Sequence, residues 1–189
     1  MKEVAQMRRP NPWRLIGWGA AVVLLAAPFA AMQFHAEGVD WSPGDFLFAG
    51  LLFALVGGLL ELAVRKIRSG WYRAAVAVAL LGNLLVIWSN LAVGIVGSEN
   101  NPANQLFFAA LLVGIGGAFI ARFRAGGMAV SMGATAVSLL VALLVASLGG
   151  TDEPKANHSV EVIATGLFAA LFLISAGLFR RSAQSSSSS

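Results

Sequence analysis

The sequence contains no cysteine and only two histidines. The absence of cysteine excludes disulfide bonds, thiolate nucleophiles, cysteine zinc sites and c-type haem attachment. Charged residues are also scarce, at 12% of 189 residues, whereas soluble domains carry about 25%. So little polar surface cannot cover a water-soluble globule, and lipid must therefore be the solvent for most of the chain.

Several motifs of common enzymes are missing as well. The chain has no glycine-rich phosphate loop, no HExxH zinc motif and no dinucleotide-binding fingerprint. No nucleophile and base pair falls inside an apolar run. We therefore expect the protein not to be an enzyme and to hold no cofactor. Its basic residues lie at segment ends rather than on a patch with interleaved aromatic residues, which argues against nucleic acid as a partner.

Apolar sequence, in contrast, is abundant: 58% of the residues are hydrophobic and the mean hydropathy is +0.77. Six apolar runs stand out, each close to the roughly 20 residues that a helix needs to cross a bilayer. They are Leu15–Phe34, Phe46–Val64, Trp71–Val96, Leu106–Ala121, Met128–Leu148 and Val160–Phe179. Backbone amides in lipid must be satisfied within the segment. The sequence therefore predicts an all-α fold, a bundle of six transmembrane helices that forms one domain over residues 1–181.

The two ends of the chain differ in character from the apolar runs between them. The serine-rich stretch from Ser182 to Ser189 cannot bury apolar surface, so a disordered tail is predicted there. At the other end, Arg8-Arg9, an apolar run and the small residues around Pro28 are also typical of a signal peptide. Cleavage there would leave five crossings and an outer N-terminus.

Basic residues in the connectors predict the orientation. Twelve of the thirteen lysines and arginines fall on one side of the predicted membrane, and Lys155 alone falls on the other. The twelve are Lys2, Arg8, Arg9, Arg14, Arg65, Lys66, Arg68, Arg73, Arg122, Arg124, Arg180 and Arg181. Because positive charge is retained in the cytoplasm, both termini are expected there.

An internal repeat is also suggested by the sequence. Pro43, Asp45, Phe48 and Gly57-Gly58 recur 59 residues later, in the same register, as Pro102, Asn104, Phe107 and Gly116-Gly117. The second and third helices would then match the fourth and fifth as two parallel copies of one hairpin. Chance similarity between apolar segments is the alternative.

Polar residues inside the apolar runs are the first candidate site residues. Asn83 and Asn90 are seven residues apart and share one face of the third run. They would line a path for a substrate or ion, or else join helices by bonding to hydroxyls such as Ser131, Thr135 and Ser138. Glu61 lies four residues before Arg65 and would form an ion pair with it. A proton or cation relay at the inner mouth is the alternative for Glu61.

The connector between the third and fourth runs is the densest group of amide side chains in the chain. This polar loop (Ser98–Asn104) holds Glu99, Asn100, Asn101, Pro102 and Asn104. It is short enough to predict a tight turn, with Asn104 near the start of the next helix as a capping residue. A docking or ligand site at the outer face is the alternative.

The two histidines suggest a metal site. His158 and Glu161 lie three residues apart, a spacing that places imidazole and carboxylate on one helical face. His35, with Glu37 or Asp40, would complete a site at the outer face. Two solvated surface histidines near carboxylates are the alternative.

Residues Val86–Asn104 form a signature that is similar to one family. Arg65, the turn Arg122-Phe123-Arg124 and the closing Leu178–Arg181 extend the likeness over most of Ile16–Arg181. On these residues the chain resembles an uncharacterised family of small polytopic bacterial inner-membrane proteins. The resemblance implies a bacterial inner-membrane location and a compact helical membrane unit, and it brings no activity, cofactor or catalytic residue.

Three functions follow from these observations. The first is a small transporter or channel-like protein in which Asn83, Asn90 and the polar loop line or gate a path. The second is a non-transport assembly or sensing subunit that binds another membrane protein, or a second copy of itself, through glycine-rich faces. The third is a metal or haem binder at the outer face. Lipid is the partner common to all three.

Overall fold

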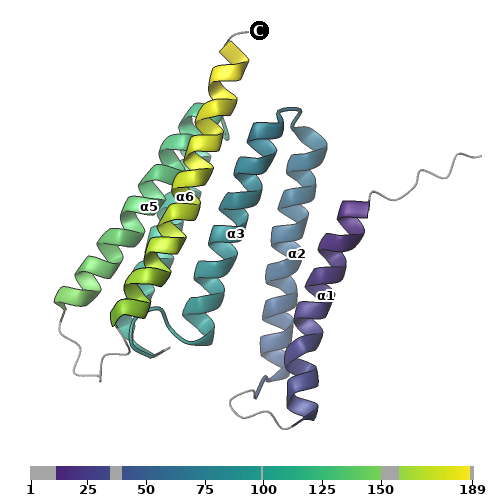
Figure 1. Ribbon diagram of the computed structural model, residues 1–189, viewed down its shortest axis with the longest axis vertical. Helices are drawn as coiled ribbons and strands as arrows, with labels where there is room; N and C mark the ends of the chain where they lie inside the picture. The colour runs from purple at the N-terminus through teal and green to yellow at the C-terminus, as the bar shows by residue number, and fades with distance from the viewer. Residues whose placement is uncertain (1–11, 35–39, 99, 150–157, 188–189) are drawn as a thin grey trace, which may run out of the picture. The chain divides into compact units, whose positions relative to one another are not determined.

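The protein is described from a computed structural model that covers residues 12–34, 40–98, 100–149 and 158–187 (Figure 1). All elements in these ranges are helical. They are α1 (Pro12–Gln33), α2 (Pro43–Lys66), α3 (Gly70–Ala92), the short 3-10 helix η1 (Pro102–Asn104), α4 (Gln105–Ile120), α5 (Ala125–Leu148) and α6 (His158–Ser187). Six helical spans are long and apolar enough to cross a membrane. The predicted all-α membrane fold is confirmed.

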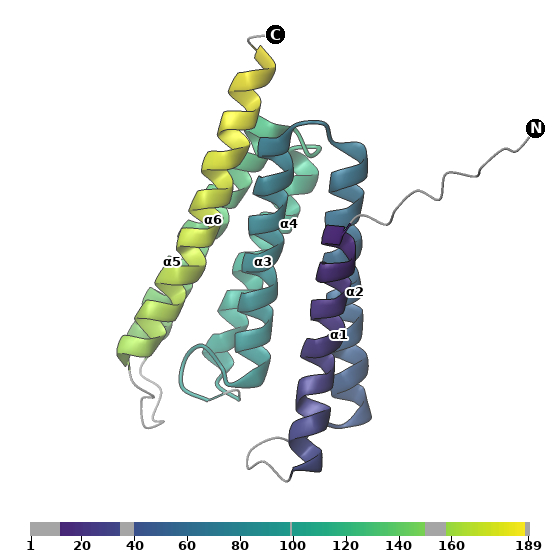
Figure 2. The same cartoon turned by 45° about the vertical axis from the view of Figure 1, so that its right-hand side comes forward.

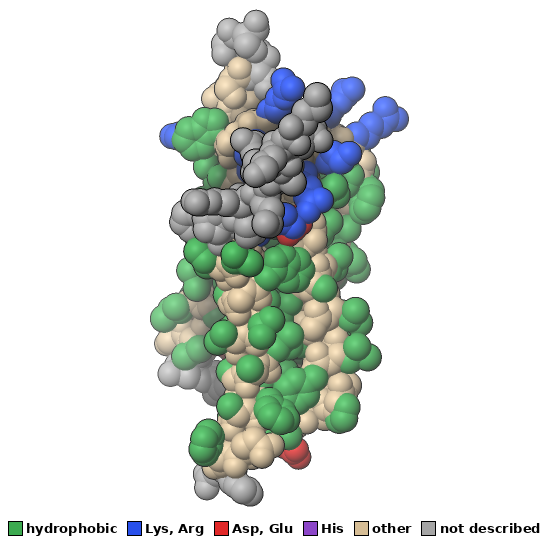
Figure 3. Space-filling view, turned by 90° about the vertical axis from the view of Figure 1, so that its right-hand side faces the viewer, with side chains coloured by type: hydrophobic (Ala, Val, Ile, Leu, Met, Phe, Trp, Pro, Cys, Tyr) green, Lys and Arg blue, Asp and Glu red, His purple; other side chains and the backbone are tan. Residues whose placement is uncertain are grey.

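Large apolar side chains cover the outer faces of the helices. Phe119, Ile120, Val130 and Leu148 are among the many that are exposed. Hydrophobic side chains are spread along the face drawn in Figure 3, and Lys and Arg side chains gather near one end of it. Soluble monomers rarely expose apolar patches above a few hundred Å². The exposed faces are therefore lipid-facing, as expected for an integral membrane protein.

Two helix ends differ from the sequence-based boundaries. α3 ends at Ala92, before the predicted Val96, because Gly94 and Gly97 adopt left-handed φ angles of 75° and 65°. α6 continues to Ser187, although a disordered tail is predicted from Ser182. The Ser182 side chain is buried, and its Oγ lies 3.0 Å from that of Ser69. Packing against the start of α3 therefore extends the helix into serine-rich sequence.

The contacts divide the chain into two compact units, and the single domain stays a prediction. Unit 1 comprises Met1–Leu59 and unit 2 comprises Leu60–Ser189. In unit 1, α2 begins with a reciprocal cap in which the Ser42 N–H donates to Asp45 (2.8 Å) and the Asp45 N–H donates to Ser42 Oγ (3.3 Å). A Cβ on Gly57 would lie 3.0 Å from the Trp18 ring, so glycine lets the indole of α1 pack there.

In unit 2, α6 packs between α3 and α5, and α4 packs on α5. Figure 1 shows α5 and α6 side by side, and Figure 2 brings α4 into view. Apart from Ala169, the buried residues of α6 recur at alternating spacings of four and three, the pattern of a left-handed helix pair. They are Glu161, Thr165, Phe168, Phe172, Ser175, Phe179 and Ser182. This stripe therefore begins with two polar residues, continues with two phenylalanines and then alternates serine with phenylalanine.

Close packing of α4 on α5 depends on two glycines. A Cβ on Gly114 would collide with Thr135, and one on Gly117 would collide with Ser131. The Ser131 hydroxyl donates to the carbonyl of Gly114 at 2.7 Å, a typical small-residue contact with a hydrogen bond. By contrast, Gly116 has open space around its Cβ position.

The two proposed repeat copies start alike but use their polar residue differently. Both Pro43 and Pro102 open a helical segment. Asp45 caps its own helix, whereas the Asn104 side chain makes no capping bond. The repeat stays a prediction.

Arginines of unit 2 collect at one end of its helices. The Tyr72 hydroxyl at the start of α3 donates to the carbonyl of Phe123 in the α4–α5 turn. Near the end of α6, the guanidinium of Arg181 lies 5.3 Å from the centre of the Trp71 ring. These contacts bring three basic segments together. Their residues are Arg68 and Arg73, Arg122 and Arg124, and Arg180 and Arg181.

Candidate functional site

Asn104 organises the polar end of unit 2, opposite the arginines. Its Oδ1 accepts hydrogen bonds from the N–H groups of Ile95 and Val96, both at 3.0 Å. Its Nδ2 donates to the carbonyls of Val96 (3.3 Å) and Ser98 (2.7 Å). The side chain is buried, and all four hydrogen-bonding positions of the amide are used. The amide therefore replaces the helical bonds that the chain loses after Ala92.

Glycine makes this wrapping sterically feasible. Gly94 turns the chain with φ of 75°, and a Cβ there would lie 2.5 Å from the Ser98 carbonyl oxygen and 2.8 Å from Asn104 Nδ2. Side chains other than glycine rarely adopt this backbone conformation. The loop therefore closes on Asn104 only because no side chain stands between them.

Asn101, rather than Asn104, caps the helical segment that follows. Its Oδ1 accepts from the Ala103 N–H at 2.9 Å, and Pro102 occupies the first position of η1. Asn104 lies at the start of α4, as predicted, but its side chain points back to the loop. Asn100 is exposed on the same loop, and Glu99 lies outside the described residues.

The two candidate asparagines of α3 have different roles. Asn90 is buried, and its Nδ2 donates to the backbone carbonyl of Asn104 at 2.8 Å, which ties the end of α3 to the start of α4. Asn83 instead donates to Ala79 of its own helix at 2.8 Å. Two of the α5 hydroxyls that were expected to bond to the Asn83 amide donate elsewhere. The Ser131 hydroxyl donates to the Gly114 carbonyl, and the Thr135 hydroxyl donates to the Ser131 carbonyl. Asn90 therefore belongs to the site, and Asn83 bonds along its own helix.

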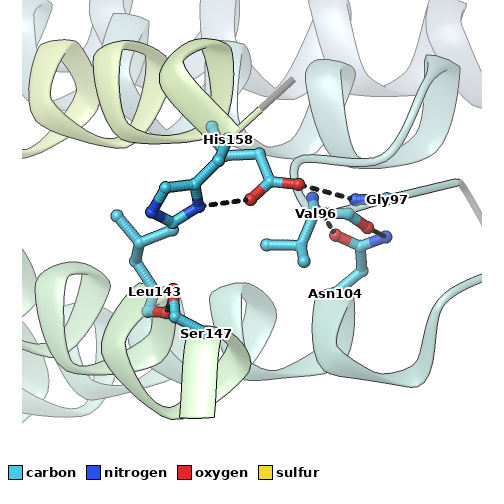
Figure 4. A network of polar contacts seen from close by, with 7 residues as sticks. Val96, Gly97, Asn104, Leu143, Ser147 and His158 are labelled. Atoms are coloured by element: carbon cyan, nitrogen blue, oxygen red, sulfur yellow. Dashed lines mark hydrogen bonds and ion pairs between the residues drawn. The ribbon is translucent and has the colours of Figure 1, made fainter. Parts of the chain in front are cut away.

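Glu161 links the loop to α6 through its contacts with Gly97 and His158, both of which are labelled in Figure 4. This carboxylate is 7% exposed, and it lies in the first turn of α6. One oxygen accepts from the Gly97 N–H at 3.1 Å, and the other lies 3.3 Å from His158 Nδ1. A negative charge is favourable at a helix N-terminus. The predicted His158–Glu161 pairing is thus present, and the Gly97 N–H is a third member of the group.

The wider metal site involves residues outside the described ranges. His35 and Glu37 are among them. Within residues 12–34, 40–98, 100–149 and 158–187, no group of three His, Asp or Glu side chains is placed to hold a metal ion.

Glu61 makes the ion pair expected from its spacing. Its Oε2 lies 2.9 Å from an Arg65 guanidinium nitrogen, one turn along α2. Arg65 is largely exposed, so this pair contributes little to stability.

Three buried polar atoms near the loop have no hydrogen-bond partner within the described residues. They are Asn90 Oδ1, Asn101 Nδ2 and Thr165 Oγ1. Thr165 is fully buried and lies one turn after Glu161 on the stripe of α6. Sequence reasoning missed it, although its spacing of four from Glu161 places both side chains on one face.

The antiparallel register of α3 and α6 places Asn90 level with this turn of α6. The Ser175 hydroxyl donates to the Ala75 carbonyl at 2.8 Å, and Gly82 accommodates the Phe172 ring. Counting the same number of residues forward along α3 and backward along α6 from the Ala75–Ser175 contact pairs Asn90 with Val160. The same count from the Gly82–Phe172 contact pairs Asn90 with Ala164. Asn90 therefore lies between the levels of Glu161 and Thr165.

The site thus combines an amide oxygen, a hydroxyl and a carboxylate at the end of the α3–α6 contact. Such a set can bind a polar solute or a cation, and it offers no nucleophile with an adjacent base. Comparison of the chain with protein-family models, with curated proteins and with solved structures finds no match.

Proposed function

We propose that this integral membrane protein is a small transporter or channel-like protein of the bacterial inner membrane, with its binding site at the polar-loop end of unit 2. One observation carries the proposal: Asn90 Oδ1 and Thr165 Oγ1 are buried without partners among the described residues, within about one helical turn of each other along the α3–α6 contact. Burying such a group unsatisfied costs about 1–3 kcal/mol. A bound polar ligand would supply the missing contacts.

The stripe of α6 supports a gated path. After Thr165, toward the C-terminal end of α6, the stripe continues with Phe168 and Phe172, and the next polar residue on it is Ser175. The aromatic pair separates the loop-end site from the basic end, as a closed barrier would. Polar groups inside a membrane are costly and typically mark pathways for solutes or ions.

The second candidate is a non-transport assembly or sensing subunit. Gly58 and Gly116 favour it, because both are exposed in mid-helix with open space around their Cβ positions. Exposed small residues allow a second helix to approach closely. This candidate needs no solute flux, which distinguishes it from transport.

Flux measurements test the proposal. The purified full-length chain is reconstituted in liposomes, ion gradients are followed with sodium-, potassium- and pH-sensitive dyes, and neutral solutes are followed by osmotic swelling. We expect flux of one solute class above that of empty liposomes. Thr165→Val should reduce it several-fold, whereas Thr135→Val, which removes a hydroxyl bonded to Ser131, should leave it near wild type. No flux of any class above empty liposomes would contradict transport.

The orientation of the chain is proposed with the basic end in the cytoplasm. Because the protein has no cysteine, single cysteines report the side directly. Arg68→Cys and Asn100→Cys both replace exposed residues at opposite ends of α3. In intact bacterial cells, an impermeant maleimide should label Asn100→Cys and should reach Arg68→Cys only after permeabilisation. Labelling of both residues from one side would overturn this threading.

A further inference from the structure

We infer that Asn90, Glu161 and Thr165 form a binding site for a small monovalent cation. The inference rests on the proposed function, because it names the ligand class of that same site. It starts from two oxygens without partners among the described residues and one buried carboxylate, which lie within about one turn along the α3–α6 contact.

The donor set favours a cation over other ligands. Asn90 offers an amide oxygen, and its nitrogen is already used on the Asn104 carbonyl. Each Glu161 oxygen has one partner, Gly97 N–H or His158, and a carboxylate oxygen can accept a second contact. Oxygen ligands of this kind bind hard cations. An anion would be repelled by the negative charge of the Glu161 carboxylate.

The hydroxyl of Thr165 is held differently from comparable hydroxyls in the bundle. Thr135 and Ser147 both donate to the carbonyl four residues earlier in their own helix, at 3.0 and 2.8 Å. This back-bond is the usual way to satisfy such a group within a helix. Thr165 makes no such bond, although it is completely buried. Its oxygen is therefore left without a partner among the described residues.

Charge sets the valence of the ion. Glu161 is the one buried carboxylate among the residues that the structure describes, and it stands at the first turn of α6. A single positive charge neutralises it in a low-dielectric site, whereas a divalent ion would leave a net buried charge.

Thermal unfolding tests the inference without any flux assay. The melting temperature of the purified full-length chain is measured by tryptophan fluorescence in choline chloride, into which NaCl, KCl or NH4Cl is titrated at constant ionic strength. A ligand that binds only the folded state raises the melting temperature with its concentration. We expect a saturable rise with at least one of the three cations, and the arm that responds identifies the ion.

Variants of matched shape locate the response. Thr165→Val should raise the half-saturating cation concentration at least about tenfold, the usual effect of losing one contact to a charged ligand. Thr165→Ser keeps the hydroxyl and should keep most of the response, and Thr135→Val should match wild type. Equal melting temperatures in all four salts, with Thr165→Val more stable than wild type, would show an empty or water-filled site and overturn the inference. The inference would also be overturned if Thr165→Val had the same half-saturating cation concentration as the wild-type protein.

The two proposals fail separately. Cation-dependent melting without flux would leave the cation site and remove transport. Flux of a neutral solute without cation-dependent melting would leave transport and remove the cation site.

Discussion

Replacement of Asn104 by alanine is expected to lower the free energy of unfolding by about 3–5 kcal/mol. The change removes four hydrogen bonds to backbone groups of the segment Ile95–Ser98. Each buried backbone group that is left without a partner costs about 1–3 kcal/mol. The loop would also lose the geometry that presents the Gly97 N–H to Glu161.

The measurement is thermal or denaturant unfolding of the purified protein, followed by tryptophan fluorescence. Asn83→Ala is the matched control, because its amide makes a hydrogen bond to Ala79 within a single helix. Alanine also has the higher helix propensity, so the control should stay within about 1 kcal/mol of wild type. Equal stability of the two variants would show that the amide of Asn104 does not organise the loop.

The helices could be predicted from sequence because lipid leaves the backbone few choices. An apolar run of sufficient length must satisfy its amides internally, and this rule found all six spans. The end of α3 was placed too late because the runs of apolar letters continue through Ile95 and Val96. Those two residues are buried in the loop rather than in a helix, with their N–H groups on Asn104.

The site was only partly predictable. The composition of the polar loop singled out Asn101 and Asn104, but it could not say which amide caps η1 and which turns back to the loop. That choice depends on the left-handed turns at Gly94 and Gly97, which no spacing rule specifies. Thr165 was missed because a single threonine in an apolar run normally bonds within its own helix.

Gly94→Ala is expected to destabilise the protein by about 3 kcal/mol or more. A left-handed backbone costs a residue with a Cβ roughly 1–2 kcal/mol. The new methyl group would also lie 2.5 Å from the Ser98 carbonyl oxygen, which is backbone and cannot rotate away. Moving the loop to relieve this contact would break the hydrogen bonds to Asn104, so the overpacking adds about 1–3 kcal/mol.

Gly116→Ala provides the control, because the same substitution there meets no neighbouring atom and should raise stability by up to about 1 kcal/mol. Gly94→Ala combined with Asn104→Ala tests whether both act on one structure. Residues of a shared network are not additive, so the double variant should lose at least about 1 kcal/mol less than the two single losses together. Strict additivity in the unfolding measurements would mean that Gly94 and Asn104 stabilise separate parts of the molecule. In that case the loop would have no single organising amide, and the link from Asn104 through Gly97 to Glu161 would have to be abandoned.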